Sequence, residues 1–314
     1  MENLELIKKI KELQVAKNAV IMAHYYQEPE IQDIADFIGD SLALAQKALE
    51  TEAEIIILAG VNFMAETAKI INPSKKVLLP APEAGCSLAD SCPADRFETF
   101  VKSFPDHIVI TYVNTTAEVK ALSDISCTSS NAVKIVESLP DDQKIIFGPD
   151  RNLGNYINSL TGREMLLWDG ACHVHEEFSL EKILDLKKKH PEAKILAHPE
   201  CQKPILIVSD HIGSTAELLR FSKNDTATEY IVATESGIIH QMKKASPHKH
   251  FIPAPPNDST CACNDCMYMK MVTLQKIYDC LLNETGEVIL DEELRIKAEK
   301  PIRRMLEISS KLGL

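Results

Sequence analysis

Cysteines at matched positions of a threefold repeat are the residues of this chain most suited to chemistry. The three positions hold Cys86, Cys172 and the C-x-C-x-x-C cluster of Cys261, Cys263 and Cys266. Thiolates gathered around one point suit an iron–sulfur cluster or zinc. Three ligands rather than four leave one iron open as a Lewis acid. Two alternatives stay open: burial as small apolar residues, or, for the last cluster alone, a zinc half-site or redox pair.

The repeat itself is anchored on a polar residue that closes an apolar run, in VIMAH, IVITY and KILAH. An aspartate follows each anchor after 12 residues and a hydroxyl residue after 17. The anchors are His24, Tyr112 and His198; the aspartates are Asp36, Asp124 and Asp210; and the hydroxyl residues are Ser41, Ser129 and Thr215. Three similar units that each contribute one ligand-type residue predict a site at the junction of three domains.

Two further groups suit proton transfer. Pro199 forces an extended turn, so His198 and Glu200 are expected to point the same way as an acid–base pair, the alternative being a structural ion pair. Tyr26 follows a strand end and can move a proton if its pKa is lowered, or else packs at a domain seam. Arg151 could hold a phosphate or brace an interface. His173 and His175 flank Cys172, and one of them could contact substrate.

Composition limits the classes of protein that fit. The 314 residues are 45% apolar and 25% charged, which is ordinary for a globular protein of two or three domains. A net charge of −12 argues against general nucleic-acid binding. No apolar run reaches membrane-spanning length and the amino-terminal segment is charged, so we expect a cytoplasmic protein with no membrane partner. Nine cysteines in that compartment favour metal binding or catalysis over disulfides.

Short apolar runs alternate with helical segments, a pattern typical of parallel sheets covered on both faces. In the first unit we expect strands at 19–23, 54–59 and 77–79 and helices at 33–50 and 63–72. In the second we expect strands at 108–112, 144–147 and 165–168 and helices at 129–138 and 152–160. In the third we expect strands at 194–197, 230–233 and 250–252 and helices from Thr215 and Ile238. Helices at 268–283 and 292–312 follow.

These elements predict three small α/β sandwiches with three- or four-stranded parallel sheets. We expect domains at residues 86–172 and 173–266, and a first domain of residues 1–85 completed by residues 267–314. Ligands of such sheets bind beyond the carboxyl ends of the strands. The anchors lie there, and the repeated hydroxyls lie at or near helix starts that attract anions. The sequence therefore predicts a cavity for a small polyanion.

Several long motifs resemble the quinolinate synthase (NadA) family across nearly the whole chain: AHYYQEPEIQDIADFIGDSLALA, AGCSLADSC, YVNTTAEVKALSDISCTSSNAV, FGPDRNLG, HPECQKP and GSTAELL. The resemblance implies three Rossmann-like α/β/α domains around a pseudo-threefold axis. It also implies one [4Fe-4S] cluster per chain held by three cysteines. The implied reaction is the transferase step of de novo NAD biosynthesis that condenses iminoaspartate with dihydroxyacetone phosphate to quinolinate, phosphate and water.

The resemblance also assigns residues by motif. The cluster ligands that it implies are Cys86, Cys172 and Cys266, and the proton-transfer residues are Tyr26 and Glu200, with His198 beside them. The substrate-binding residues that it implies are His24, Ser41, Tyr112, Asn114, Ser129, His198, Glu200 and Thr215. It further suggests functional coupling to an L-aspartate oxidase, because an imine is short-lived in water.

The chain departs from the family pattern near the last ligand. Many relatives have C-x-x-C-x-x-C there, whereas this chain has one residue between Cys261 and Cys263, whose roles stay open and include a redox disulfide. Met267 and Val272 replace a common proline and a common asparagine. Two rival functions remain: an iron–sulfur hydro-lyase for another substrate, and a metal- or redox-sensing protein that uses only the last cysteine cluster.

Overall fold

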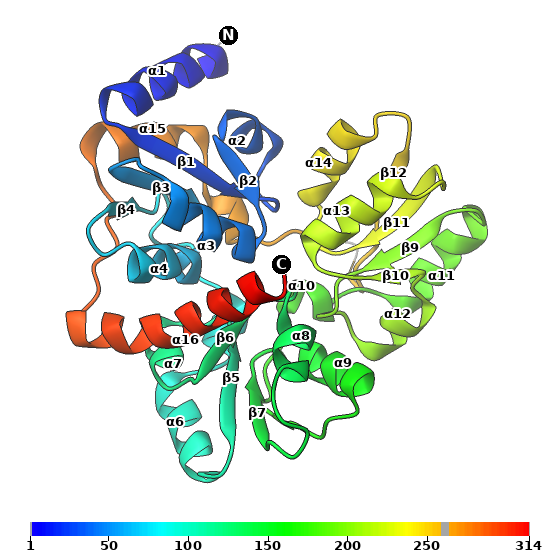
Figure 1. Ribbon diagram of the computed structural model, residues 1–314. Coiled ribbons are helices and arrows are strands. Elements are labelled where there is room, and N and C mark those ends of the chain that lie inside the picture. The colour runs from blue at the N-terminus through cyan, green and yellow to red at the C-terminus, as the bar shows by residue number, and fades with distance from the viewer. Residues whose placement is uncertain (1, 259–263, 314) are drawn as a thin grey trace.

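Three lobes surround the centre of the molecule in the computed structural model, which describes residues 2–258 and 264–313 (Figure 1). Each lobe contains one four-stranded parallel sheet. The strand orders are β2-β1-β3-β4, β6-β5-β7-β8 and β10-β9-β11-β12, so the same topology occurs three times. This confirms the predicted α/β class with three parallel sheets.

The first unit carries its sheet between helices on both faces. Its elements are α1 (Glu2–Ala16), β1 (Ala19–His24), α2 (Pro29–Ile34), β2 (Phe37–Gly39), α3 (Ser41–Glu50), β3 (Ile55–Ala59), α4 (Asn62–Ile71) and β4 (Lys76–Leu78). β3 is buried along its whole length, which explains why its sequence is continuously apolar.

The second and third units repeat this plan. The second contains α5 (Ser87–Asp90), α6 (Ala94–Lys102), β5 (Ile108–Tyr112), α7 (Ala117–Ala121), β6 (Ile125–Cys127), α8 (Ala132–Glu137), β7 (Ile145–Gly148), α9 (Arg151–Thr161) and β8 (Leu166–Leu167). The third contains α10 (His173–Glu176), α11 (Leu180–Lys189), β9 (Lys194–Ala197), α12 (Lys203–Val208), β10 (His211–Ile212), α13 (Thr215–Asn224), β11 (Glu229–Ala233), α14 (Ile238–Ala245) and β12 (His250–Pro253).

The repeated aspartate has the same structural task in each unit. Its carboxylate accepts the backbone N–H of the strand residue three positions before the anchor, and its own N–H donates to that residue's carbonyl. The carboxylate distances are 2.8 Å from Asp36 to Ile21, 2.8 Å from Asp124 to Val109 and 2.7 Å from Asp210 to Ile195. The aspartate thus fixes the turn that leads into the edge strand, which accounts for its constant spacing.

Three expectations about helices are wrong. The single helix expected at residues 33–50 is divided into α2 and α3 by strand β2, which pairs with β1. The helix expected to begin at Ser129 begins at Ala132 instead, because the chain first makes a turn after strand β6. The helix expected from Tyr268 begins at Leu274, after the short 3-10 helix η1 (Met269–Met271).

The two long C-terminal helices pack on different parts of the molecule. Helix α15 (Leu274–Asn283) lies against α1 and β3 of the first unit. Helix α16 (Glu292–Lys311) packs against α7 and β6 of the second unit and α4 of the first, and Figure 1 shows it running between these two lobes. The largest apolar core accordingly includes residues of the first two units and both C-terminal helices. The domain boundaries given above remain a prediction.

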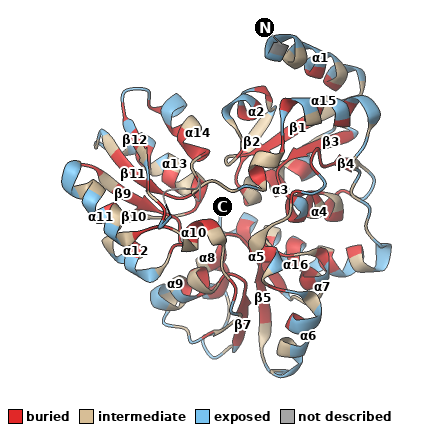
Figure 2. Ribbon diagram, turned by 180° about the vertical axis from the view of Figure 1, so that it is seen from behind, coloured by how far each residue is buried: buried red, intermediate tan, exposed pale blue. Residues whose placement is uncertain are grey.

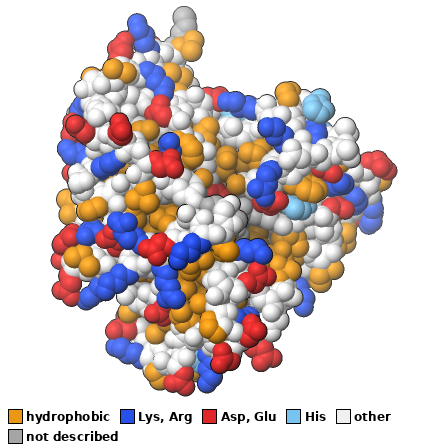
Figure 3. All heavy atoms as spheres, in the orientation of Figure 1, with side chains coloured by type: hydrophobic (Ala, Val, Ile, Leu, Met, Phe, Trp, Pro, Cys, Tyr) orange, Lys and Arg blue, Asp and Glu red, His pale blue; other side chains and the backbone are white. Residues whose placement is uncertain are grey.

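Buried residues follow the strands in all three lobes, whereas exposed residues lie on the outer helices (Figure 2). Acidic and basic side chains are interspersed over the face seen in Figure 3. No helix among the described residues has the length and apolar character needed to cross a bilayer.

Candidate active site

One cavity is lined by every residue that the family resemblance assigned to the site. These twelve residues, from all three units, are His24, Tyr26, Ser41, Cys86, Tyr112, Asn114, Ser129, Cys172, His198, Glu200, Thr215 and Cys266. His24 and Tyr112 are the last residues of β1 and β5, and His198 directly follows β9. The three sheets therefore direct the carboxyl ends of their central strands at one space, as the topology of parallel sheets requires.

The three cavity cysteines differ from the other described cysteines. Cys86, Cys172 and Cys266 are half-buried and line the cavity, whereas Cys92, Cys127, Cys201 and Cys280 are buried and do not line it. The latter four are therefore residues of the protein interior and not candidates for a site in the cavity. Cys261 and Cys263 lie outside the described residues.

Each cavity cysteine precedes a short helical turn. Cys86 and Cys172 cap the amino ends of α5 and α10, and Cys266 lies three residues before η1. Burial raises the pKa of Cys86 to about 12, while the backbone N–H groups of Ala89 and Leu88 act in the opposite direction. Burial, the Glu200 carboxylate and the thiols of Cys86 and Cys266 raise the pKa of Cys172. A cation would therefore be needed to hold these sulfurs as thiolates, and the backbone N–H groups that already hydrogen-bond to them suit a metal–thiolate site.

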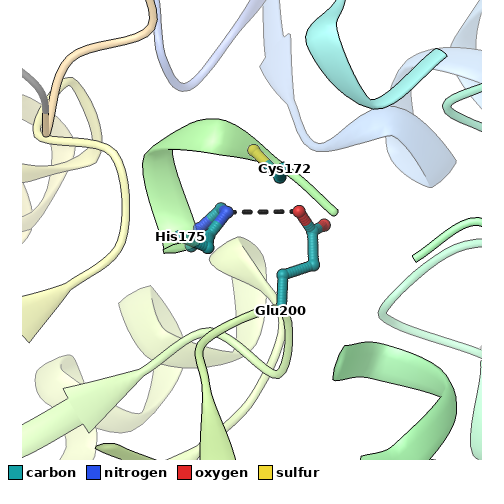
Figure 4. Close-up of side chains that lie close together, drawn as sticks. All are labelled: Cys172, His175 and Glu200. Atoms are coloured by element: carbon teal, nitrogen blue, oxygen red, sulfur yellow. Dashed lines mark ion pairs between the residues drawn. The ribbon is translucent and has the colours of Figure 1, made fainter. Parts of the chain in front are cut away.

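The thiols are not arranged as the ligands of a single zinc ion. A tetrahedral zinc site has Zn–S bonds of about 2.3 Å, which places its sulfurs about 3.8 Å apart. Among the described residues, the three sulfurs do not form a set whose atoms all lie within 4.8 Å of one another. Atoms of Cys172, His175 and Glu200 do form such a set, in which the imidazole and the carboxylate face each other beside the sulfur (Figure 4).

Glu200 is the centre of a buried polar network. It accepts a 2.6 Å hydrogen bond from Tyr112 Oη, and its other oxygen lies 3.1 Å from His175 Nδ1. His198 Nδ1 lies 3.6 Å from Glu200 Oε1, so the two side chains do point the same way. Burial alone would raise the pKa of Glu200, but the adjacent His175 imidazole and the hydrogen bond from the Tyr112 hydroxyl outweigh it and hold that pKa below the usual range. Glu200 is therefore a carboxylate at neutral pH.

Tyr26 continues this network from the first unit. Its hydroxyl lies 2.8 Å from Thr215 Oγ1 and 2.9 Å from Thr234 Oγ1, and Thr234 Oγ1 lies 3.0 Å from His175 Nε2. Burial holds the pKa of Tyr26 well above its usual range, although the two threonine hydroxyls oppose the shift. The lowered pKa on which proton transfer by Tyr26 was made conditional is therefore not found, and the Tyr26 hydroxyl is protonated at neutral pH.

The anchor histidines are neutral. Burial lowers the pKa of His24 and of His198 to about 3. His198 Nδ1 accepts the N–H of Glu200 at 3.4 Å, so Nε2 carries the proton and donates to Ser129 Oγ at 3.2 Å. In the same way, His24 Nδ1 accepts the N–H of Tyr26 at 3.2 Å. Both imidazoles therefore supply a neutral N–H donor.

The repeated hydroxyls lie in the cavity wall, with one difference between the units. Ser41 and Thr215 are the first residues of α3 and α13, whose amino ends favour anions. Ser129 instead lies in the turn before α8. Among the described residues, Asn114 Oδ1 and Thr128 Oγ1 are buried without a hydrogen-bond partner, so both remain available to a ligand.

The structure adds a residue that the sequence did not single out. Glu235, two residues after β11, lines the cavity and accepts the N–H groups of Cys266 and Gly237 at 3.2 and 2.8 Å. Burial raises its pKa to about 7, although Lys270, 2.9 Å away, opposes the rise. The only feature of the sequence that could have indicated Glu235 is its position in the loop after a strand. Its ion-pair partner Lys270 lies 35 residues later, so the sequence does not reveal the pair.

Two candidates have structural partners instead. Arg151 forms ion pairs with Asp169 at 3.1 Å and Glu176 at 2.9 Å and does not line the cavity, so it braces the loop that carries Cys172. His173 Nδ1 lies 2.7 Å from Ser87 Oγ, which joins the Cys172 turn to the Cys86 turn.

Comparison with known proteins agrees over nearly the whole length. The family described as quinolinate synthetase A protein (NadA) matches residues 8–307. A quinolinate synthase of Thermosynechococcus vestitus is 56% identical over 306 residues, covering 98% of this chain and 96% of its own. One from Chloroherpeton thalassium is 56% identical over 309 residues, with the same two coverages. One from a Nostoc species is 57% identical over 307 residues, covering 98% of this chain and 94% of its own.

Proposed function

This chain belongs to the quinolinate synthase family of NAD biosynthesis enzymes, and we propose that it condenses iminoaspartate with dihydroxyacetone phosphate to form quinolinate, phosphate and water. The observation that carries this proposal is the single cavity that holds three thiols, three repeated hydroxyls and the Tyr26–Glu200 network. The substrates together bring two carboxylates and a phosphate, the kind of small polyanion for which such a cavity is suited.

The cofactor in this proposal is one [4Fe-4S] cluster held by Cys86, Cys172 and Cys266. Three thiols that line one cavity, each followed by a short helical turn whose backbone N–H groups hydrogen-bond to the sulfur, support this ligand set. When bound, the cluster supplies Lewis acidity from the one iron that no protein residue ligates. The other four described cysteines are buried and do not line the cavity, so none of them is a candidate for a fourth ligand.

Substrate binding in this proposal relies on neutral donors. Ser41 and Thr215 stand at the amino ends of ten-residue helices, and His24 and His198 add neutral N–H groups. Asn114 has an unpaired buried oxygen that can accept a hydrogen bond from a substrate O–H or N–H group. Together these groups can hold carboxylates and phosphate without forming tight ion pairs, which would hinder the departure of phosphate.

Glu200 and Tyr26 handle protons at opposite ends of one network. Glu200 is ionised and can remove a proton, whereas Tyr26 is protonated and can donate one. Thr234 and His175 lie between them at hydrogen-bond or ion-pair distance. The residues thereby support formation of the carbon–carbon bond, loss of phosphate, a ketose-to-aldose proton shift, and ring closure with loss of water.

The test combines cofactor analysis with an activity assay under anaerobic conditions. The reconstituted chain should contain about four irons and four sulfides and should form quinolinate from iminoaspartate and dihydroxyacetone phosphate. A full cluster without quinolinate would favour a hydro-lyase acting on another substrate. Metal bound without any need for Cys86 or Cys172 would favour the sensing protein. Higher yield when an L-aspartate oxidase generates the imine in the same vessel would support the proposed coupling.

A further inference from the structure

A second group of metal-ligand side chains lies outside the cavity, on the third unit. It consists of His190, directly after α11, Glu229, the first residue of β11, and His250, the first residue of β12. Glu229 and His250 are register partners on neighbouring parallel strands. The group therefore lies at the amino ends of these strands, whereas the cavity lies at the carboxyl ends of the same sheet.

The distances within the group are close to those of a tetrahedral site. Glu229 Oε1 lies 2.8 Å from His190 Nδ1 and 2.8 Å from His250 Nδ1, and the ligand atoms of all three residues lie within 4.8 Å of one another. Bonds of about 2.0 Å to zinc place tetrahedral ligands about 3.3 Å apart. Each contact thus has to open by only about 0.5 Å for an ion to enter, and the backbone of two strands and a helix end holds the three residues in place.

The electrostatics and exposure also suit a cation. The hydrogen bond from His250 is the main cause that lowers the pKa of Glu229, so the carboxylate is ionised. Two lysines near the group are engaged elsewhere: Lys187 with the Ala193 carbonyl, and Lys194 with Asp225 at 2.7 Å. The His250 side chain is 63% exposed, so the site is open to solvent and can keep a water as fourth ligand.

We propose that His190, Glu229 and His250 bind one divalent transition-metal ion of the zinc class, separate from the three-cysteine site. Imidazole and carboxylate ligands in this ratio favour zinc over magnesium or calcium, which prefer oxygen alone. The ion ties the end of α11 to the first residues of β11 and β12. β12 is an edge strand, and the ion would hold its first residue, so binding should slow local opening of this strand.

The experiment uses the full, tag-free chain with its cluster in place. Zn²⁺ is titrated anaerobically by calorimetry into the wild type, His250→Ala and Glu229→Gln. His248→Ala is the matched control, because His248 is an exposed histidine in the turn just before β12. The wild type and His248→Ala should bind one more zinc than the other two, or bind it at least about tenfold more tightly. Zinc should slow hydrogen exchange of the β12 amides only in the wild type and in His248→Ala.

Glu229→Gln retains side-chain size and an oxygen that can accept a hydrogen bond, so it separates ligand loss from misfolding. Cluster absorbance and quinolinate formation should be the same in all four proteins, which confirms folding and shows that zinc is not taken up at the cluster cysteines. Equal zinc stoichiometry and affinity in the wild type, His250→Ala and Glu229→Gln would overturn the proposal.

Discussion

Replacing Glu200 by glutamine removes one charge from the centre of the cavity while preserving its shape. The glutamine oxygen can still accept from Tyr112 Oη, which lies 2.6 Å from the present carboxylate, and the amide can occupy the place 3.1 Å from His175. The side chain is 3% exposed, so solvent cannot supply the missing base. Glu200→Gln should therefore leave the cluster and substrate affinity largely intact and reduce turnover.

The size of the loss follows from the role of a positioned proton-transfer group. Such groups contribute about 10² to 10⁴ in rate, which corresponds to about 2.7–5.5 kcal/mol in the activation barrier. Because the pKa of Glu200 lies below its ordinary value of 4.5, the wild-type carboxylate is already ionised above about pH 5. The wild-type rate should not fall through protonation of Glu200 between pH 5 and 8. Ionised Glu200 stabilises the folded protein at pH values above 4.5, the pKa of a glutamate in the unfolded chain. This contribution is lost only as the pH falls through the lower pKa that Glu200 has in the folded protein.

The assay follows anaerobic quinolinate formation at varied concentrations of both substrates, with cluster absorbance recorded for each preparation. Glu176→Gln is the matched control, because Glu176 lies outside the cavity and binds Arg151 and Asn152. It should retain turnover within about threefold. Glu200→Gln with a full cluster and a kcat within about threefold of the wild type would refute the proposed role of Glu200.

Three further predictions address the ligands, the acid and a buried lysine. Cys86→Ala, Cys172→Ala and Cys266→Ala should each lose the cluster absorbance, and Cys280→Ala, in the core of α15, should keep it; a full cluster in any of the first three removes that residue as a ligand. Tyr26→Phe should lower kcat about 10²-fold or more, and an unchanged kcat would count against Tyr26 as the proton donor. Because the pKa of Tyr26 is raised, the wild-type pH profile should show no loss of activity from its ionisation below about pH 10. Burial lowers the pKa of Lys120 from 10.5 to about 8, so the unfolded chain binds more protons between these values. Wild-type stability should then rise by about 3 kcal/mol over that pH window, and urea denaturation of Lys120→Met should lack the rise; equal slopes in both proteins would contradict it.

Much of the fold could be predicted because each central strand carries its own signal. β5 and β9 have the predicted bounds, since short apolar runs buried on both faces have few other uses. The edge strands β2, β6 and β10 were missed, because two or three residues of mixed character become strand only by pairing with β1, β5 and β9. The aspartates that fix these turns were visible in the sequence as spacing, but their hydrogen bonds were not.

For the site, the sequence by itself determined which residue types recur at which spacing, and all twelve predicted residues line one cavity. Only the tertiary structure decided their ionisation, because pKa values depend on burial and on neighbours from other units. Burial among residues of other units raises the pKa of Tyr26 further above neutrality, and Tyr112 and His175, which reach Glu200 from other segments, hold its pKa low although the carboxylate is buried. Glu235 became visible in the same way, through Lys270. Residue identity and spacing are local properties of the chain, whereas charge state belongs to the assembled cavity.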